Sequence, residues 1–124
     1  MKNCSQILFP QTACQNCECI PSYSRLTFRL KVGQSLGLHR DGSVLKLSVF
    51  ATEMRRRLWW YITELDVLVA EECGFPPSQI HRADARMPLN INDADISTTD
   101  TTPPVERSEF TELTWALIRV SSLP

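Results

Sequence analysis

The chain has 124 residues, 43% of them hydrophobic and 22% charged, which is typical of one globular domain and excludes a disordered polypeptide. A formal net charge of −1 argues against a domain whose main surface binds a polyanion, since such domains are usually clearly basic. No stretch approaches the ~20 apolar residues that cross a bilayer, and the first apolar run, Ile7-Leu8-Phe9, is too short for a signal peptide. With an odd number of cysteines, five, we expect an intracellular, reducing compartment.

Residues 1–21 show no helical or strand period and are predicted to form an irregular leader, separate from a second unit that spans residues 22–124. Four of the five cysteines lie in this leader: Cys4, Cys14, Cys17 and Cys19. Thiolates can bind zinc, but a closed site needs four ligands, and Cys4 would have to reach across the intervening chain. The spacing matches no zinc module, so we interpret the leader as metal-free.

Residues 22–38 are predicted to form a helix with Ser22 or Ser24 as its N-cap. Its apolar or small face comprises Leu26, Leu30, Gly33 and Leu36. Gly33 favours the close approach of a neighbouring helix. Gly37 is expected to adopt the left-handed conformation that ends a helix, with Leu38 folded back onto the last turn.

A loop with an Asp41-Gly42 turn leads to the longest predicted helix, residues 50–73, which is capped by Ser48 and ended by Gly74. Spacing predicts one wide buried stripe on this helix, with Trp59 at its edge. The stripe consists of Met54, Leu58, Tyr61, Ile62, Leu65, Leu68 and Val69.

Residues 75–107 form a proline-rich connector, and residues 108–123 are predicted to be a helix capped by Ser108 or Thr111. The expected anchors of the connector are Ile80, Met87, Leu89, Ile91 and Ile96. The expected apolar face of the last helix is Phe110, Leu113, Leu117 and Val120. The predicted fold class is therefore all-α, an irregular helical array that forms an incomplete piece of a larger helical domain.

The run Arg55-Arg56-Arg57 followed by Trp59-Trp60 could bind phosphates or stack on bases. On a helix, however, three consecutive residues spread over about 200°, so they cannot all face one groove. We therefore favour structural roles: stacking of arginine on tryptophan, and ion pairs with Glu53, Glu64 or Asp66.

Paired acids at Asp93 and Asp95, near Glu106 and Glu109, could hold a divalent cation. Aspartate in a proline-rich loop is more often a cap or a solvated surface residue, so we predict no metal ligand here.

His39-Arg40-Asp41 matches the start of a protein-kinase catalytic loop, but Lys46 stands where that loop needs asparagine, and no glycine-rich phosphate loop is present. His81 and Cys73 have no nucleophile or base at a useful spacing. The sequence thus predicts no catalytic, cofactor-binding or metal-binding residue, and no enzyme.

Three blocks in order, residues 33–43 (GQSLGLHRDGS), 53–60 (EMRRRLWW) and 88–95 (PLNINDAD), closely resemble the fungal-specific transcription factor domain, and residues 110–119 (FTELTWALIR) look like the start of its next helix. This is the middle homology, or regulatory, region of fungal zinc binuclear cluster transcription factors, related to that of xylanolytic activators. The resemblance covers residues 22–123. In one departure from the family, Val49 and Ala51 replace the proline and acid that follow the capping serine.

The resemblance implies an all-helical regulatory domain of a nuclear regulator of RNA polymerase II transcription, longer in the family than here. Family members read DNA through a separate six-cysteine cluster with two zinc ions, which the cysteines of this chain do not match. We therefore expect zinc and DNA contact only in that missing module, with co-regulators or a homodimer partner as protein partners and no membrane. The alternative is a truncated paralogue, a protein-interaction module without DNA binding. The residues expected to carry the structure are Leu36, Leu38, Met54, Leu58, Trp59, Ile62, Leu65 and Trp115.

Overall fold

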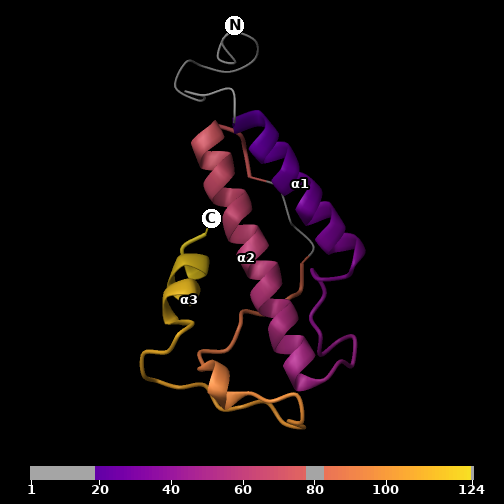
Figure 1. The fold of residues 1–124 in the computed structure, drawn as a ribbon, viewed down its shortest axis with the longest axis vertical. Coiled ribbons are helices and arrows are strands. Elements are labelled where there is room, and N and C mark those ends of the chain that lie inside the picture. The colour runs from indigo at the N-terminus through magenta and orange to yellow at the C-terminus, as the bar shows by residue number, and fades with distance from the viewer. Residues whose placement is uncertain (1–18, 78–82, 124) are drawn as a thin grey trace, which may run out of the picture.

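A computed structural model describes residues 19–77 and 83–123, with the side chains of the first two helical residues, 19 and 20, left out. The elements are α1 (Cys19–Ser35), α2 (Val49–Cys73), the short 3-10 helix η2 (Asp93–Asp95) and α3 (Thr114–Ser121). The described residues contain no strand, which confirms the all-α class. Figure 1 shows α1 and α2 side by side with opposite directions, and α3 on the other flank of α2.

Helix α1 begins at Cys19, before either serine that was expected to cap it. The predicted caps are wrong because Ser22 and Ser24 lie inside the helix. Pro21 explains the earlier start, since a proline in the first helical turn removes no intrahelical hydrogen bond. The C-terminal end is confirmed: Gly37 has φ 72°, and the amide of Leu38 donates to the carbonyl of Gly33 over 2.9 Å.

The contact between α1 and α2 forms the core, which contains Leu30, Leu38, Trp59 and Ala85. A Cβ atom on Gly33 would lie 3.5 Å from Leu38 and 3.7 Å from the Trp59 ring, which are ordinary van der Waals distances, so the packing here does not require a glycine. Leu36 was expected in this core, but it is 65% exposed. It follows the last helical residue, Ser35, and its side chain lies outside the core that Leu38 enters.

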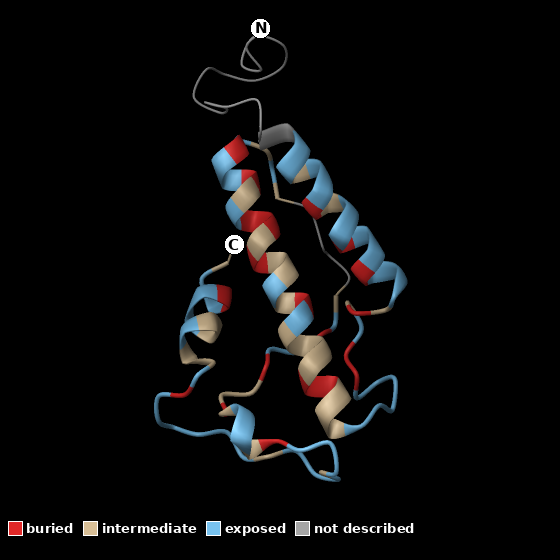
Figure 2. Cartoon of the chain, viewed as in Figure 1, coloured by how far each residue is buried: buried red, intermediate tan, exposed pale blue. Residues whose placement is uncertain are grey.

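Helix α2 confirms the predicted caps: Ser48 accepts a hydrogen bond from the amide of Ala51 at 3.2 Å, and Gly74 is left-handed with φ 68°. The predicted buried stripe is wrong, because Leu58, Tyr61 and Leu68 are 48%, 56% and 47% exposed. Figure 2 shows the resulting mixture of exposed and buried positions along α2. The residues of α2 that are buried are Thr52, Glu53, Trp59, Glu64, Asp66, Val67, Ala70 and Cys73. Three of these carry charged groups, which a periodicity of apolar residues does not detect.

The connector is anchored by Ile91 and Ile96, as predicted, but Met87 is 38% exposed and is not an anchor. Ile80 lies outside the described residues. Leu89 is half-buried.

Helix α3 begins at Thr114, not near residue 108, and its N-cap is Leu113, so neither predicted cap is correct. The preceding backbone is bonded elsewhere: the Asn90 side-chain amide donates to the carbonyls of Arg107 (2.7 Å) and Glu109 (3.1 Å). Phe110 and Trp115 make an edge-to-face contact with ring centroids 5.6 Å apart, yet both are exposed, so Trp115 is not a core residue. In the described part of the chain, no helix is long and apolar enough to cross a membrane.

Candidate functional site

The first part of the site is a buried ion pair between the loop after α1 and the start of α2. Arg56 donates to both carboxylate oxygens of Asp41, from Nε at 2.7 Å and from Nη2 at 2.8 Å. Asp41 also accepts from the amides of Ser43 and Arg86 and from the Ser43 hydroxyl. These donors hold the pKa of Asp41 far below its usual range, with Arg56 as the largest cause. Asp41 thus joins the loop, α2 and the 83–91 segment.

Gly42 lets the loop lie against α2. A Cβ atom on this residue would lie 2.5 Å from the Thr52 hydroxyl oxygen and 2.8 Å from the Thr52 Cα. The glycine is therefore required by the close approach to Thr52.

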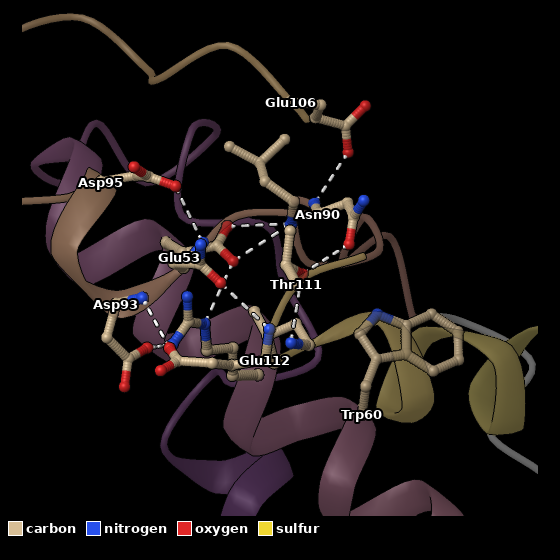
Figure 3. A network of polar contacts seen from close by, with 12 residues as sticks. Glu53, Trp60, Asn90, Asp93, Asp95, Glu106, Thr111 and Glu112 are labelled. Atoms are coloured by element: carbon tan, nitrogen blue, oxygen red, sulfur yellow. Dashed lines mark hydrogen bonds and ion pairs between the residues drawn. The ribbon is translucent and has the colours of Figure 1, made fainter. Parts of the chain in front are cut away.

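The second part of the site is the buried carboxylate of Glu53, which lies about one turn before Arg56 on α2 (Figure 3). Glu53 accepts from Arg57 Nε at 3.3 Å and from the amide of Leu89 at 3.1 Å. Arg57 also donates from Nη1 to Asp93 at 2.6 Å, which ties η2 to α2. Burial raises the pKa of Glu53, because desolvation outweighs its hydrogen bonds. The predicted pairing of Arg57 with Glu53 is confirmed.

The remaining member of the arginine run, Arg55, donates from Nη2 to the carbonyl of Leu36 at 3.1 Å, where α1 has just ended. The three consecutive arginines therefore point to three different parts of the protein, as helical geometry predicted. Trp60 donates from its ring nitrogen to the Arg86 carbonyl at 2.9 Å. The run thus organises the fold around α2.

The third part is the attachment of the segment before α3, centred on Asn90 (Figure 3). Its side-chain oxygen accepts from the hydroxyls of Thr111 (2.7 Å) and Thr114 (3.0 Å). Asp95 pairs with Arg107 through Nε at 2.6 Å, which lowers the pKa of that carboxyl. These contacts place α3 beside α2.

Helix α3 is tied to α2 directly by Arg119 Nε and Glu64, which lie 2.7 Å apart. A mostly apolar cleft lies between these two helices, and its lining includes Trp60, Tyr61, Leu117 and Val120. The cleft holds no group arranged for nucleophilic attack. Of its three charged residues, Glu64 and Arg119 are paired with each other, and Arg57 is paired with Glu53 and Asp93.

Three of the four acidic candidates for a cation site, Asp93, Asp95 and Glu106, are engaged by the protein. Asp93 and Asp95 face arginines, and Glu106 accepts from the amide of Asn90 at 3.2 Å. In residues 19–77 and 83–123 no group of three or more histidine, cysteine or acidic residues could hold a metal ion. Cys4, Cys14, Cys17 and His81 lie outside the described residues, and the Cys19 side chain is not described.

The triplet His39-Arg40-Asp41, which matches the start of a kinase catalytic loop, has a structural role. The His39 ring faces Trp59, with centroids 6.1 Å apart, and the carbonyl of His39 accepts from the amides of Asp84 and Ala85. Arg40 pairs with Asp84 at 3.0 Å. Sequence reasoning missed Asp41 as a centre of the fold, and missed Asn90. The signal available was the presence of both residues in the blocks that carry the family resemblance.

Comparison with known proteins fits this arrangement. Residues 7–122 match the fungal specific transcription factor domain. The chain belongs to this family. The match covers nearly the whole chain, and it includes every residue of the polar network around α2. The family is one of transcription factors, not of enzymes.

Curated relatives of this domain are regulators of transcription. The chain is 40% identical over 90 residues to pyriculol/pyriculariol biosynthesis cluster transcription factor 1 of Pyricularia oryzae, covering 72% of this chain and 12% of the relative. It is 31% identical over 97 residues to transcriptional regulator AacuB of Aspergillus aculeatus, covering 77% and 13%. It is 33% identical over 93 residues to the aurofusarin cluster transcription factor aurR2 of Gibberella zeae, covering 73% and 14%. The chain thus spans only a small part of the length of these relatives. No solved structure matches it significantly.

Proposed function

We propose that this chain is a regulatory domain of a fungal transcription factor, which acts in the nucleus on RNA polymerase II transcription and leaves DNA contact to another module. The match of residues 7–122 to the family supports the class. Relatives named for the pyriculol and aurofusarin clusters support a narrower proposal, control of a biosynthetic gene cluster.

The observation that carries the proposal is the use of the arginine run. Arg56 is bound to buried Asp41, Arg57 to Glu53 and Asp93, and Arg55 to the end of α1. An arginine that reads DNA must offer its guanidinium to phosphates or base edges. These three guanidinium groups are held by the protein instead, which supports a role that does not include DNA contact.

A regulatory domain of this kind acts through its helical surfaces. The polar network fixes the position of α2 relative to α1, η2 and α3. A co-regulator that binds one surface would therefore meet a preformed arrangement, so little ordering would be needed on binding.

The test is a reporter assay in which the chain is fused to an unrelated DNA-binding domain. We expect the fusion to change RNA polymerase II reporter output relative to the DNA-binding domain alone. Asp41→Asn should abolish the change, because it removes the charge that holds Arg56, whereas Val105→Ala, at a position 89% exposed, should preserve it. Unchanged output with the intact fusion would contradict the proposal.

The competing hypothesis, a protein-interaction module without any link to DNA, predicts a different pattern. Such a module would leave the tethered reporter unchanged but would lower the output of a co-expressed full-length regulator by binding it. The two assays together therefore separate the hypotheses.

A further inference from the structure

The side of helix α1 that faces away from α2 carries apolar and basic side chains that the described chain leaves exposed. We call it the α1 outer face, and it consists of Arg25, Phe28, Arg29, Lys31 and Val32. All five residues are exposed, and the two apolar members, Phe28 and Val32, are 67% and 39% exposed. Figure 2 shows how much of α1 is exposed, with its few buried positions toward α2. The α1 outer face is therefore open to a partner.

Helical geometry places the apolar pair of this face between its basic groups. Phe28 and Val32 are four residues apart, so they are neighbours on the helix surface. At 3.6 residues per turn, Arg25 and Arg29 lie on one side of this pair and Lys31 lies on the other. The α1 outer face thus has an apolar centre with positive charge on both flanks.

The positive charges of α1 are not balanced within the helix. Its 17 residues, CIPSYSRLTFRLKVGQS, include Arg25, Arg29 and Lys31 but no acidic residue. Among the residues that the structure describes, these three side chains have no ion-pair or hydrogen-bond partner. The arginine run of α2 differs, because its guanidinium groups are held within the chain. The α1 cations are therefore available to carboxylates of another molecule.

A hollow beside the apolar pair indicates what kind of molecule that is. It has a volume of about 290 Å³ and is lined by Tyr23, Ser24, Thr27, Phe28 and Lys31. Such a hollow suits an apolar side chain that projects from an amphipathic helix. A lipid bilayer has no projecting side chain to fill it, and nucleic acid would leave Val32 uncovered, because valine has no ring on which a base can stack. An acidic protein segment matches both the charge and the apolar centre.

We propose that the α1 outer face binds an acidic amphipathic helix of another protein. Apolar side chains of that helix, spaced three or four residues apart, cover Phe28 and Val32. Its carboxylates pair with Arg25 and Arg29 on one flank and with Lys31 on the other, so charge complementarity gives the contact its specificity. The proposal rests on α1 alone, so it can fail without affecting the proposed role in transcription, and the converse also holds.

The first experiment is fluorescence anisotropy of the 124-residue chain with a fluorescein-labelled helical peptide of the same length as α1, with leucines on one face and glutamates on both flanks. We expect saturable binding. Arg29→Glu should raise the Kd at least about tenfold, because it places like charges in contact. Phe28→Ala should raise the Kd several-fold, because it removes most of the apolar centre.

The matched control for charge is Lys46→Glu, in the exposed loop before α2, which changes the net charge by as much as Arg29→Glu and should leave the Kd nearly unchanged. All three positions are exposed, so the variants should fold, which circular dichroism checks. Absence of saturable binding, or an unchanged Kd with Phe28→Ala, would overturn the proposal. An equal loss with Lys46→Glu would also overturn it, because net charge alone would then explain the binding.

The second experiment compares classes of partner under the same conditions. A peptide with lysine in place of every glutamate, and another with alanine in place of every leucine, should each bind at least about tenfold more weakly than the acidic amphipathic peptide. Duplex DNA and phosphatidylserine vesicles are measured alongside, and we expect both to bind more weakly than that peptide. Tighter binding of DNA or vesicles that is lost with Arg29→Glu would overturn the proposal, and would make the α1 outer face a polyanion-binding surface.

Discussion

The two flanks of α2 are held by different forces. On one flank, α1 packs through a small apolar core around Trp59. On the other flank, the segment from η2 to α3 is held mainly by hydrogen bonds and ion pairs through Arg57, Asn90, Arg107 and Arg119. The stability of the first flank depends on the packing of apolar side chains, so salt and pH should hardly change it. The second depends on polar groups, so it should open at a lower free energy than the core.

The largest effect should come from the apolar flank. Trp59→Ala removes a side chain that is 1% exposed and leaves a cavity between α1 and α2. We expect the free energy of unfolding to fall by about 3–5 kcal/mol, measured by urea denaturation. Trp115→Ala is the matched control: its side chain is 65% exposed, and the change should cost less than about 0.5 kcal/mol. Equal losses of unfolding free energy in the two variants would contradict the burial of Trp59 and the exposure of Trp115.

Asp41 combines features of both flanks, because its side chain is buried like the apolar core and charged like the polar contacts. Asp41→Asn leaves Arg56 without its counter-ion in a site 12% exposed, which should cost about 3 kcal/mol at neutral pH.

The pH dependence has a definite sign. The folded-state pKa of Asp41 is depressed, so its stabilising contribution is complete above the unfolded-state pKa of about 3.9 and is lost as pH falls through the folded-state value. The wild-type free energy of unfolding should therefore fall below about pH 4 more steeply than that of Asp41→Asn. Parallel acid limbs in the two proteins would contradict this role.

The stability of the polar flank should depend on one side-chain amide, that of Asn90. Asn90→Ala removes four hydrogen bonds that fix the segment before α3. We expect a loss of about 1–3 kcal/mol. Hydrogen exchange should accelerate in residues 105–121 and remain slow in the buried part of α2. Uniform acceleration over all three helices would show that the two flanks do not open separately.

The smallest effect belongs to the pair of Arg107 with Asp95. Arg107 is 43% exposed, so Arg107→Gln should lower the free energy of unfolding only slightly, and less at high salt. Thermal unfolding at low and high salt measures this difference. A loss as large as that of Asn90→Ala would place this ion pair, rather than the amide, at the centre of the attachment.

The two flanks also differ in how well the sequence predicted them. Helix α2, its caps and the closing turn of α1 follow from local rules, because Ser48, Gly37 and Gly74 act on their own backbone. The buried face of α2 does not follow, because periodicity counts the exposed Leu58 and Leu68 as core and overlooks the buried Glu53 and Glu64. Those acids are buried by partners distant in sequence, Leu89 and Arg119. The late start of α3 is likewise set by Asn90, far upstream, which no local pattern reveals.

The run of arginines was the most ambiguous feature of the sequence, since Arg55-Arg56-Arg57 beside two tryptophans also suggests a nucleic-acid site. The structure supports its interpretation as the part of α2 that ties together the loop, η2 and the end of α1.

The most direct test of this account is Arg56→Gln, with the free energy of unfolding and DNA affinity measured on the same preparation. We predict a loss of about 3 kcal/mol in stability, because Asp41 is left buried without its cation. We also predict no sequence-specific binding by the wild-type chain in fluorescence anisotropy with duplex DNA. Wild-type stability combined with specific DNA binding that the variant loses would contradict the account, and would make the arginine run a DNA-binding surface after all.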